Sequence, residues 1–350
     1  MTMIVRYLKP EDENLVDAYA ASHKDALIYH TTQWKRVIEK TYGYKPAYLL
    51  ALENDRVHGL LPLFIVRGLW GKKRLVSLPY SHMVQPICED ETVLAIILSR
   101  AEEIAKKLNA EYIQLKCELK EPGPKWEQAS FCFDSRLGLG KDIDAIFKKF
   151  KSNTRRNIKK AQKSELSIHI GRRPKDFEAF YDLIVETRKR QGAPPYSKAF
   201  FLQLYEHLDP KQMQLYLASY KNRPIAGIIM LYHGLNAIYA YGASVSDRTL
   251  LQMRPNDLLF WNVIKDAWQN DYQCFDFGIT PFHNRGLLRF KSQWGTIDTN
   301  VQYTYYLNRV SKVPVLDRSG RLGTFVSSMF RFLPRSILKA IGPIVLKLLG

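Results

Sequence analysis

The sequence is poor in cysteine and has no long apolar run. Its 350 residues include only four cysteines, scattered without the paired spacing of a zinc site or a redox dithiol. We therefore expect small buried thiols in a reducing compartment. The N-terminus meets acidic residues before any run of signal-peptide length, and no segment reaches the roughly 18 apolar residues that a membrane span needs. The sequence thus predicts a cytoplasmic protein.

Several catalytic and binding motifs are also missing. The eight histidines show no HExxH or other metal-ligand spacing, and there is neither a GxSxG nucleophile turn nor a glycine-rich phosphate loop of the Walker type. We expect no metal and no permanently bound cofactor. No helix-turn-helix or zinc-finger pattern occurs, so DNA is not an expected partner.

Acidic residues are few beside the basic ones. The chain has 52 Lys and Arg against 34 Asp and Glu, a formal net charge of +18 at pH 7. Such an excess attracts polyanions, including RNA, nucleotide-linked substrates and an anionic membrane face. Charge that serves solubility alone is the alternative. The content of 46% hydrophobic and 25% charged residues is that of a globular protein, and the length favours two domains.

An internal repeat supports the expectation of two domains. Residues 47–63 align with residues 215–231 at a constant spacing of 168, with five identical positions and further apolar exchanges. Both segments read as strand, polar turn and strand. In each half an aromatic helix precedes this hairpin, and a strand, a helix and a further strand follow it. The sequence therefore predicts a duplicated α/β unit with mixed sheets.

The repeat also sets the predicted domain bounds. We expect an N-terminal domain at residues 1–140, a basic connecting helix at 141–165, a C-terminal domain at 166–310 and a basic amphipathic segment at 311–350. Residues 141–173 hold eleven Lys or Arg and three acids, and their apolar residues are spaced to bury one helix face. A solvated basic face is one interpretation, and contact with phosphate groups is the other.

The C-terminal segment is basic and partly apolar. Residues 318–350 carry six Arg or Lys and no acid, and Pro334 and Pro343 divide the segment into short pieces. Such a segment suits the interface of an anionic bilayer, which would place the protein peripherally at the inner face of the cell membrane. A terminal helix docked on the body of the protein is an equal alternative.

Four segments carry a resemblance to a known family. Residues 275–295, FDFGITPFHNRGLLRFKSQWG, contain a strand ending in D-x-G, a loop and F-K-x-x-W-G. Three further segments match the family's other motifs in the family's order: TTQWKRVIEKTYGYKPAYLLA (31–51), TRRNIKKAQKS (154–164) and ETRKRQGAPPYSKAFFLQL (186–204). Over roughly residues 3–310 the chain resembles the FemABX-type branch of the GNAT superfamily, including its BioF2-like acyltransferase relatives.

This resemblance implies two tandem GNAT-like domains and an acyl- or aminoacyl-transferase. Such an enzyme would form an amide on an amine of an anionic, small-molecule or lipid-linked cell-envelope precursor: a peptidoglycan peptide, a glycan or a lipid-linked sugar. Its donor would be aminoacyl-tRNA, which agrees with the basic surface, or acyl-CoA, which agrees with the wider superfamily. The glycine-rich pyrophosphate turn of single-fold acetyltransferases is missing, because residues 242–261 contain one early glycine.

The resemblance also implies catalytic residues. Lys291 stands where the family has a lysine that faces the reacting carbonyl. A fixed ammonium would stabilise the oxyanion that forms when an amine attacks an ester or thioester. A surface lysine between two core aromatic residues is the alternative. Asp276 ends a strand beside a glycine, where we expect it either to orient or deprotonate the amine, or only to fix the loop.

Further residues are expected to bind substrate. Tyr239 and Tyr241 alternate with apolar residues, which predicts that both project from one sheet face, into a cleft or into the core. The other expected substrate-binding residues are Trp34, Lys35, Arg155, Arg156, Lys159, Arg188, Arg190, Tyr196 and Phe290.

A function of another class stays open beside the enzymatic one. A catalytically silent duplicate-GNAT module could bind RNA or anionic lipid through the basic surface. It predicts that loss of Lys291 changes no product, whereas charge reversal within residues 151–163 abolishes function.

Overall fold

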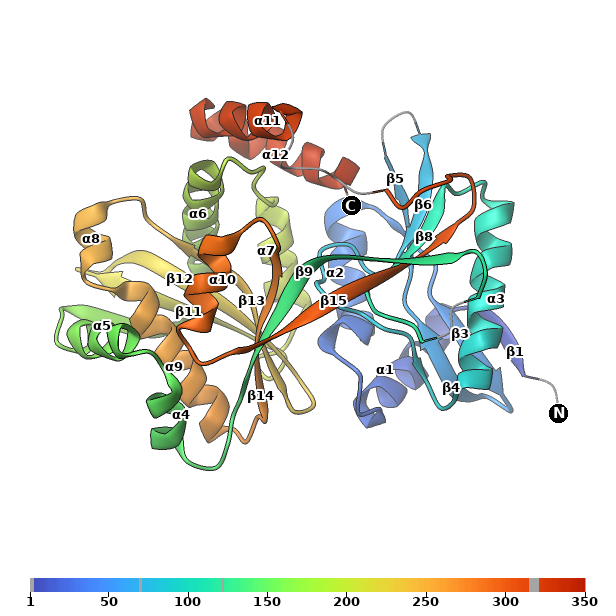
Figure 1. The fold of residues 1–350 in the computed structure, drawn as a ribbon, viewed down its shortest axis with the longest axis horizontal. Helices are drawn as coiled ribbons and strands as arrows, with labels where there is room; N and C mark the ends of the chain where they lie inside the picture. Colours follow the sequence, from blue (N-terminus) through green and yellow to red (C-terminus); the bar gives the residue numbers. More distant parts are fainter. Residues whose placement is uncertain (1–2, 69–70, 121–122, 315–320, 350) are drawn as a thin grey trace. The chain divides into compact units, whose positions relative to one another are not determined.

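The chain forms two compact units, and each unit is built from separate segments of the sequence (Figure 1). The computed structural model describes residues 3–68, 71–120, 123–314 and 321–349. The first unit comprises Met1–Cys132, Asn300–Leu316 and Lys347–Gly350, and the second comprises Phe133–Thr299 and Asp317–Leu346. In the described part of the chain, every helix is too short or too polar to span a membrane.

The first unit contains two sheets, with strand orders β1-β3-β4-β7 and β15-β8-β6-β5-β2. β6 and β8 run parallel, with Leu75 opposite Ile113, and α3 lies in the crossover between them. Because the end of β15 pairs with β8, residues 300–316 belong here, whereas the sequence prediction placed residues up to 310 in the second domain. The elements are β1 (Ile4–Tyr7), η1 (Pro10–Asp12), α1 (Glu13–Ser22), η2 (Ile28–His30), α2 (Thr32–Tyr42), β2 (Lys45–Pro46), β3 (Leu49–Glu53), β4 (Arg56–Leu61), β5 (Phe64–Arg67), β6 (Lys73–Val76), β7 (Ile87–Cys88), α3 (Glu91–Lys107), β8 (Tyr112–Leu115) and the later part of β15 (Ile297–Leu307).

The second unit is built on a mixed sheet with the order β10-β11-β12-β13-β14-β9. The first four strands pair antiparallel, and β13 and β14 run parallel with α9 in their crossover. The elements are the later part of β9 (Trp126–Gly138), α4 (Ile143–Lys149), α5 (Ser152–Gln162), β10 (Leu166–Gly171), α6 (Pro174–Gln191), α7 (Lys198–His207), β11 (Met213–Tyr220), β12 (Arg223–His233), β13 (Asn236–Ser244), α8 (Arg248–Gln252), α9 (Pro255–Gln269), β14 (Cys274–Pro281), α10 (Arg285–Ser292), α11 (Arg321–Phe332) and most of α12 (Arg335–Leu349).

The two predicted hairpins are β3–β4 and β11–β12, and their turns share one backbone conformation. Asn54 and Asp55 in the first turn, and Lys221 and Asn222 in the second, all have positive φ, as a two-residue turn between twisted strands requires. Each hairpin also carries a register shift just before its turn. In the structure Asn54 therefore corresponds to Lys221, one residue away from the alignment that the sequence suggested.

Helices cover both faces of the second unit's sheet (Figure 1). Alternate residues of β12, including Ile228 and Met230, join a core cluster with Leu259 and Val263 of α9. On the opposite face, Gly227 lies so close to α6 that an added Cβ would come within 2.7 Å of the Phe180 ring. This packing explains the apolar runs in the strands, because both of their faces are buried.

The prediction of a single connecting helix at 141–165 is wrong, because the structure has two helices there, α4 and α5. Phe150 and Lys151 between them have extended backbone, with ψ of 144° and 151°. Phe150 is 1% exposed and packs edge-on against Trp261 and Trp294, and the Lys151 amide donates to the Gln293 carbonyl at 2.9 Å. These tertiary contacts interrupt the helix that the apolar spacing of the sequence predicts.

The C-terminal segment folds into α11 and α12, and residues 315–320 lie outside the described part of the chain. α12 docks on α6 through ion pairs of Lys339 with Asp182 at 2.6 Å and of Arg335 with Glu186 at 2.8 Å. Leu338 is completely buried. These contacts favour the docked alternative for α12, and contact with a membrane stays a prediction.

Candidate active site

A buried lysine of the second unit contacts β14, which runs on to Pro281, so Asp276 does not end this strand as the sequence predicted. Lys291 on α10 is 2% exposed, so it is not the surface residue of the alternative interpretation. Its Nζ donates to the backbone oxygen of Gly278 at 2.5 Å and to that of Ile279 at 3.1 Å. Asn284 caps α10 by accepting from the Leu287 amide at 3.1 Å. The ammonium is therefore fixed by backbone oxygens and by a capped helix.

The sheet explains why this position suits a ligand. The parallel pairing of β14 with β13 ends at Asp276, opposite Ile238, and ligands of α/β sheets bind where parallel strands cease to pair, toward their carboxyl ends. Gly278 follows with φ of +72°, a left-handed conformation that glycine adopts without strain. Its carbonyl faces Lys291, and its amide donates to Asp276 Oδ1 at 2.6 Å. Gly278 thus links the Lys291 amine to the Asp276 carboxylate through two hydrogen bonds.

A second carboxylate and an arginine lie beside Asp276. Asp134 on β9 is 1% exposed, and one of its oxygens lies within 4.8 Å of an oxygen of Asp276, which is 3% exposed. Arg136 Nε donates to Asp134 Oδ2 at 2.6 Å and lies 3.9 Å from Asp276 Oδ2. Two buried carboxylates therefore share one guanidinium.

The carboxylates of Asp134 and Asp276 shift the pKa values of Arg136 and Cys274. Burial has the largest influence on the pKa of Arg136 and lowers it, but Asp134 and Asp276 together outweigh burial, so the pKa lies above its ordinary value. Burial, helped by Asp276, raises the pKa of the Cys274 thiol to about 11. The guanidinium stays charged, and the neutral thiol is a poor nucleophile. The group offers fixed positive charges and a carboxylate base, the elements of attack by an amine on an ester.

Tyr239 and Tyr241 face opposite sides of the sheet, not one side as their alternation predicted. A register shift between Ile229 and Met230 leaves an extra residue in β13 between the two tyrosines. The Tyr239 ring packs on Phe260 of α9 at 4.8 Å, and burial raises its pKa to about 12. The Tyr241 ring packs against α7, 5.5 Å from Phe200.

Arg188, Arg190 and Tyr196 come together around the end of α6. Arg188 Nε donates to the Pro194 carbonyl at 3.0 Å, and its guanidinium lies 5.4 Å from the centre of the Tyr196 ring. Arg190 Nη1 donates to the Val245 carbonyl at 2.9 Å. The structure therefore brings Arg188 and Tyr196 together, and backbone oxygens hold the guanidinium groups of both arginines.

The remaining predicted site residues lie elsewhere. Arg155 caps α4 by donating to the Lys148 and Phe150 carbonyls, and Arg156 and Lys159 are exposed on α5. Phe290 is partly buried against Phe260. In the first unit, Trp34 is completely buried and Lys35 pairs with Glu13 and Glu39 at 3.1 and 2.8 Å. Trp34 and Lys35 are therefore held inside their own unit.

Sequence reasoning missed Asp134 and Arg136. They stand in the run FCFDSRLG, where charged residues interrupt an otherwise apolar strand, and that interruption is a usable signal for a buried charge. It also missed Lys116, a buried lysine of the first unit whose Nζ donates to the Leu78 and Ser81 carbonyls, both at 2.9 Å.

The second unit matches the model of a known protein family. Residues 148–292 match the family model described as acetyltransferase (GNAT) domain, so the chain carries an acyltransferase domain of the GNAT type. A GNAT domain implies acyl-CoA as co-substrate. The prediction of a FemABX-like tandem GNAT fold is confirmed.

Three solved structures share the fold of this chain. FemX is 15% identical, with a TM-score of 0.69, over 88% of this chain and 98% of that chain. L-PGS from Bacillus licheniformis is 11% identical, with a TM-score of 0.59, over 94% and 99%. A tandem GNAT protein from the clavulanic acid biosynthesis pathway is 10% identical, with a TM-score of 0.50, over 87% and 98%. At these identities the likeness shows the fold. No curated protein sequence matches the chain.

Proposed function

We propose that this protein transfers an acyl or aminoacyl group to an amine of a cell-envelope precursor and forms an amide. The carrying observation is the buried Lys291 ammonium, which is held by the carbonyl of Gly278, the residue whose amide donates to Asp276. When an amine attacks an ester, the carbonyl oxygen becomes an oxyanion, and a charge that is already in place stabilises it without reorganisation. The envelope acceptor rests on the likeness to FemX and to L-PGS.

In this mechanism each charged side chain of the cluster has its own role. The Lys291 ammonium holds the developing oxyanion and keeps its proton. Asp276 orients the incoming amine or accepts its proton, and Arg136, whose Nε lies 3.9 Å from Asp276 Oδ2, places a positive charge beside this carboxylate. The ester bond to the donor then breaks as the amide bond forms, and the donor's hydroxyl leaves with a proton.

The donor we favour is aminoacyl-tRNA, because the helices that could receive the pyrophosphate of acyl-CoA begin with acids. In the first unit Asp90 caps α3 by accepting from the Val93 amide at 2.9 Å. In the second unit α9 begins at Pro255, which has no amide hydrogen, and Asp257 lies in its first turn. A pyrophosphate needs open amides and positive potential at a helix N-terminus. The net charge of +18 also suits a polyanionic donor.

The test is a comparison of cell-wall peptides and envelope glycans, by mass spectrometry, between a deletion strain and a strain with Lys291→Ala. We expect the same mass to be missing from both. A Lys211→Ala strain, which removes an exposed lysine of the same unit, should show the normal profile. A normal profile in the Lys291 strain would instead support the silent module that binds RNA or anionic lipid.

The donor has its own experiment. The purified chain should transfer a radiolabelled amino acid from charged tRNA to envelope precursors, and RNase should abolish the transfer. Transfer from acyl-CoA that resists RNase would overturn the choice of donor and leave amide formation standing.

A further inference from the structure

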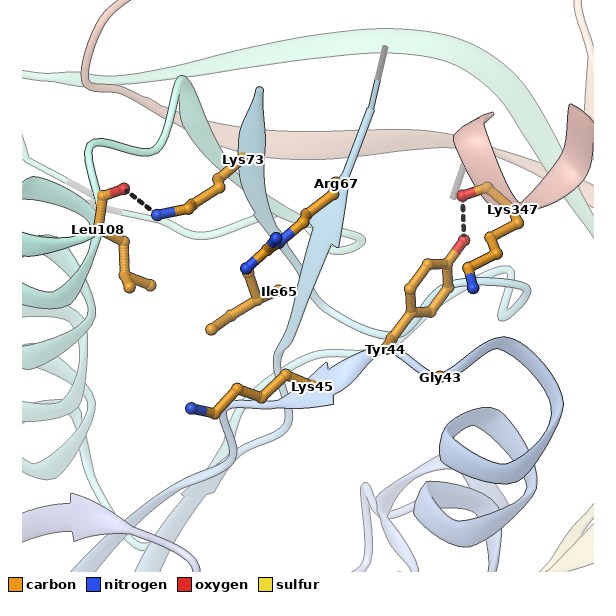
Figure 2. Close-up of a pocket in the computed structure, with 8 residues that line it drawn as sticks. All are labelled: Gly43, Tyr44, Lys45, Ile65, Arg67, Lys73, Leu108 and Lys347. Carbon is orange, nitrogen blue, oxygen red and sulfur yellow. Dashed lines mark hydrogen bonds between the residues drawn. The ribbon is translucent and has the colours of Figure 1, made fainter. Parts of the chain in front are cut away.

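A hollow in the first unit is lined by cations. Figure 2 shows this pocket, with a volume of about 380 Å³, between β2, β5, β6, the end of α3 and the last turn of α12. Four of its lining side chains are positively charged, and the other lining residues are uncharged. The four cations are Lys45, Arg67, Lys73 and Lys347.

Several other cations of the same unit have a carboxylate partner. Arg6, Arg56 and Lys72 each pair with a carboxylate, and the Lys72 ammonium beside the pocket lies 2.7 Å from Glu111. Within the described residues, none of the four pocket cations forms an ion pair with a carboxylate. Gathering like charges in one hollow is unfavourable unless an anion joins them. The pocket therefore presents a positive potential that an anionic ligand would neutralise.

Hydrogen bonds fix two sides of the pocket. Lys73 Nζ donates to the Leu108 carbonyl at 3.3 Å, and the Tyr44 hydroxyl donates to the Lys347 carbonyl at 2.6 Å (Figure 2). Arg74 Nη2 holds the same helix end by donating to the Leu348 carbonyl at 2.8 Å. Burial raises the pKa of Tyr44, so its hydroxyl stays neutral and adds no negative charge.

The shape and the chemistry point to one class of ligand. Arginine forks and lysine ammonium groups suit phosphate oxygens, and Ile65, Leu108 and the Tyr44 ring add apolar wall. A volume of about 380 Å³ lies in the range of small-molecule sites. We propose that this pocket binds a phosphate-bearing small molecule, with the phosphate on Arg67 and the lysines and the organic part on the apolar wall. This site contains none of the residues of the proposed active site.

The test titrates inorganic pyrophosphate into the full-length protein by calorimetry. The double variant Arg67→Gln/Lys73→Gln should bind roughly tenfold or more weakly, because it removes charge-assisted hydrogen bonds. The matched control Lys24→Gln/Lys40→Gln removes the same charge from exposed positions of the same unit and should bind within about twofold of the unchanged protein. Melting temperatures of all three proteins show whether each variant is folded.

Two outcomes would overturn the proposal: equal weakening in both double variants, or no binding by the unchanged protein at millimolar pyrophosphate. Competition then identifies the source of the phosphate. Displacement by phosphatidylglycerol vesicles, but not by phosphatidylcholine vesicles, indicates a lipid headgroup, and displacement only by glycerol phosphate indicates a soluble ligand. Lys291→Met should bind pyrophosphate like the unchanged protein, so this test is independent of the catalytic proposal.

Discussion

Each unit buries a lysine beyond its pair of parallel strands, and the two lysines have different electrostatic surroundings. Lys116 follows β8 and donates to the Leu78 and Ser81 carbonyls, and Lys291 follows β14 and donates to the Gly278 and Ile279 carbonyls. Burial first, and the charge of Arg74 second, lower the pKa of Lys116 to about 7. In the second unit β14 and β9 instead carry the buried carboxylates Asp276 and Asp134.

This difference separates the roles that we assign to the two units of the duplicated fold. Backbone oxygens hold an amine in both copies, so the hydrogen bonds alone do not mark an active centre. In the second unit Asp276 accepts from the amide of Gly278, whose carbonyl holds Lys291, and the buried Asp134 lies beside Asp276. The first unit has the amine without such acids and has a cationic pocket elsewhere. We therefore assign the chemistry to the second unit.

The largest stability effect should come from Arg136→Ala. This change leaves the buried Asp134 and Asp276 without a shared cation, and we expect a loss of about 2–3 kcal/mol, discounted because the Arg136 side chain is 45% exposed. Urea unfolding measures it. Arg36→Ala in the first unit is the matched control, since that side chain is 43% exposed and its partner Glu13 is more accessible than Asp134.

For Arg36→Ala we expect about 0.5–1 kcal/mol. Adding Asp134→Asn to Arg136→Ala should restore part of the lost stability, because one buried charge is removed. Equal losses for the two arginine variants, with no rescue, would show that the carboxylate pair does not distinguish the units.

The next effect is a dependence of stability on pH that comes from Lys116. The unfolded chain keeps this proton up to the ordinary pKa of 10.5, whereas the native state loses it near pH 7. Between these values the unfolded state binds more protons, so native stability rises with pH, by at most about 1.4 kcal/mol per unit. From pH 7.5 to 9.0 the unchanged protein should gain about 2 kcal/mol relative to Lys116→Met. Parallel pH curves for the two proteins would contradict the depressed pKa.

The smallest effect compares two helix ends. Gly192 ends α6 and Gly43 ends α2, with φ of +66° and +64°, so alanine costs about 1 kcal/mol at either position. At Gly192 the new Cβ would also clash with the Ser327 carbonyl oxygen, whereas at Gly43 its nearest neighbour is Lys347 Nζ at 3.8 Å. Gly192→Ala should therefore lower stability by about 1 kcal/mol more than Gly43→Ala, measured by thermal unfolding. Equal losses would mean that α11 does not cover Gly192.

The order of elements was predictable because it rests on local patterns. Helical periodicity located α3 and α9, and the strand–turn–strand pattern located both hairpins. The break at Phe150 was not predictable, because it depends on aromatic residues more than a hundred positions away. The opposite directions of Tyr239 and Tyr241 were also hidden, since a β-bulge leaves no clear mark in one sequence.

The candidate site was predictable only in part. Lys291 and Asp276 lie in one continuous motif, and their neighbourhood follows from the turn at Gly278. Asp134 and Arg136 lie on β9, which precedes the helices of the second unit in the sequence but is the neighbour of β14 in the sheet. Such long-range pairing is fixed by tertiary contacts, which no local pattern encodes.

The most direct measurement compares Lys291→Met with Lys116→Met in a transfer assay with purified protein. Both changes replace a buried lysine, whose nitrogen is bound to backbone carbonyls, by an apolar side chain of similar length. We predict that Lys291→Met lowers the transfer rate at least about 100-fold, with little change in melting temperature, and that Lys116→Met keeps the rate within a few fold. Full activity of Lys291→Met, or equal losses in both variants, would contradict the account.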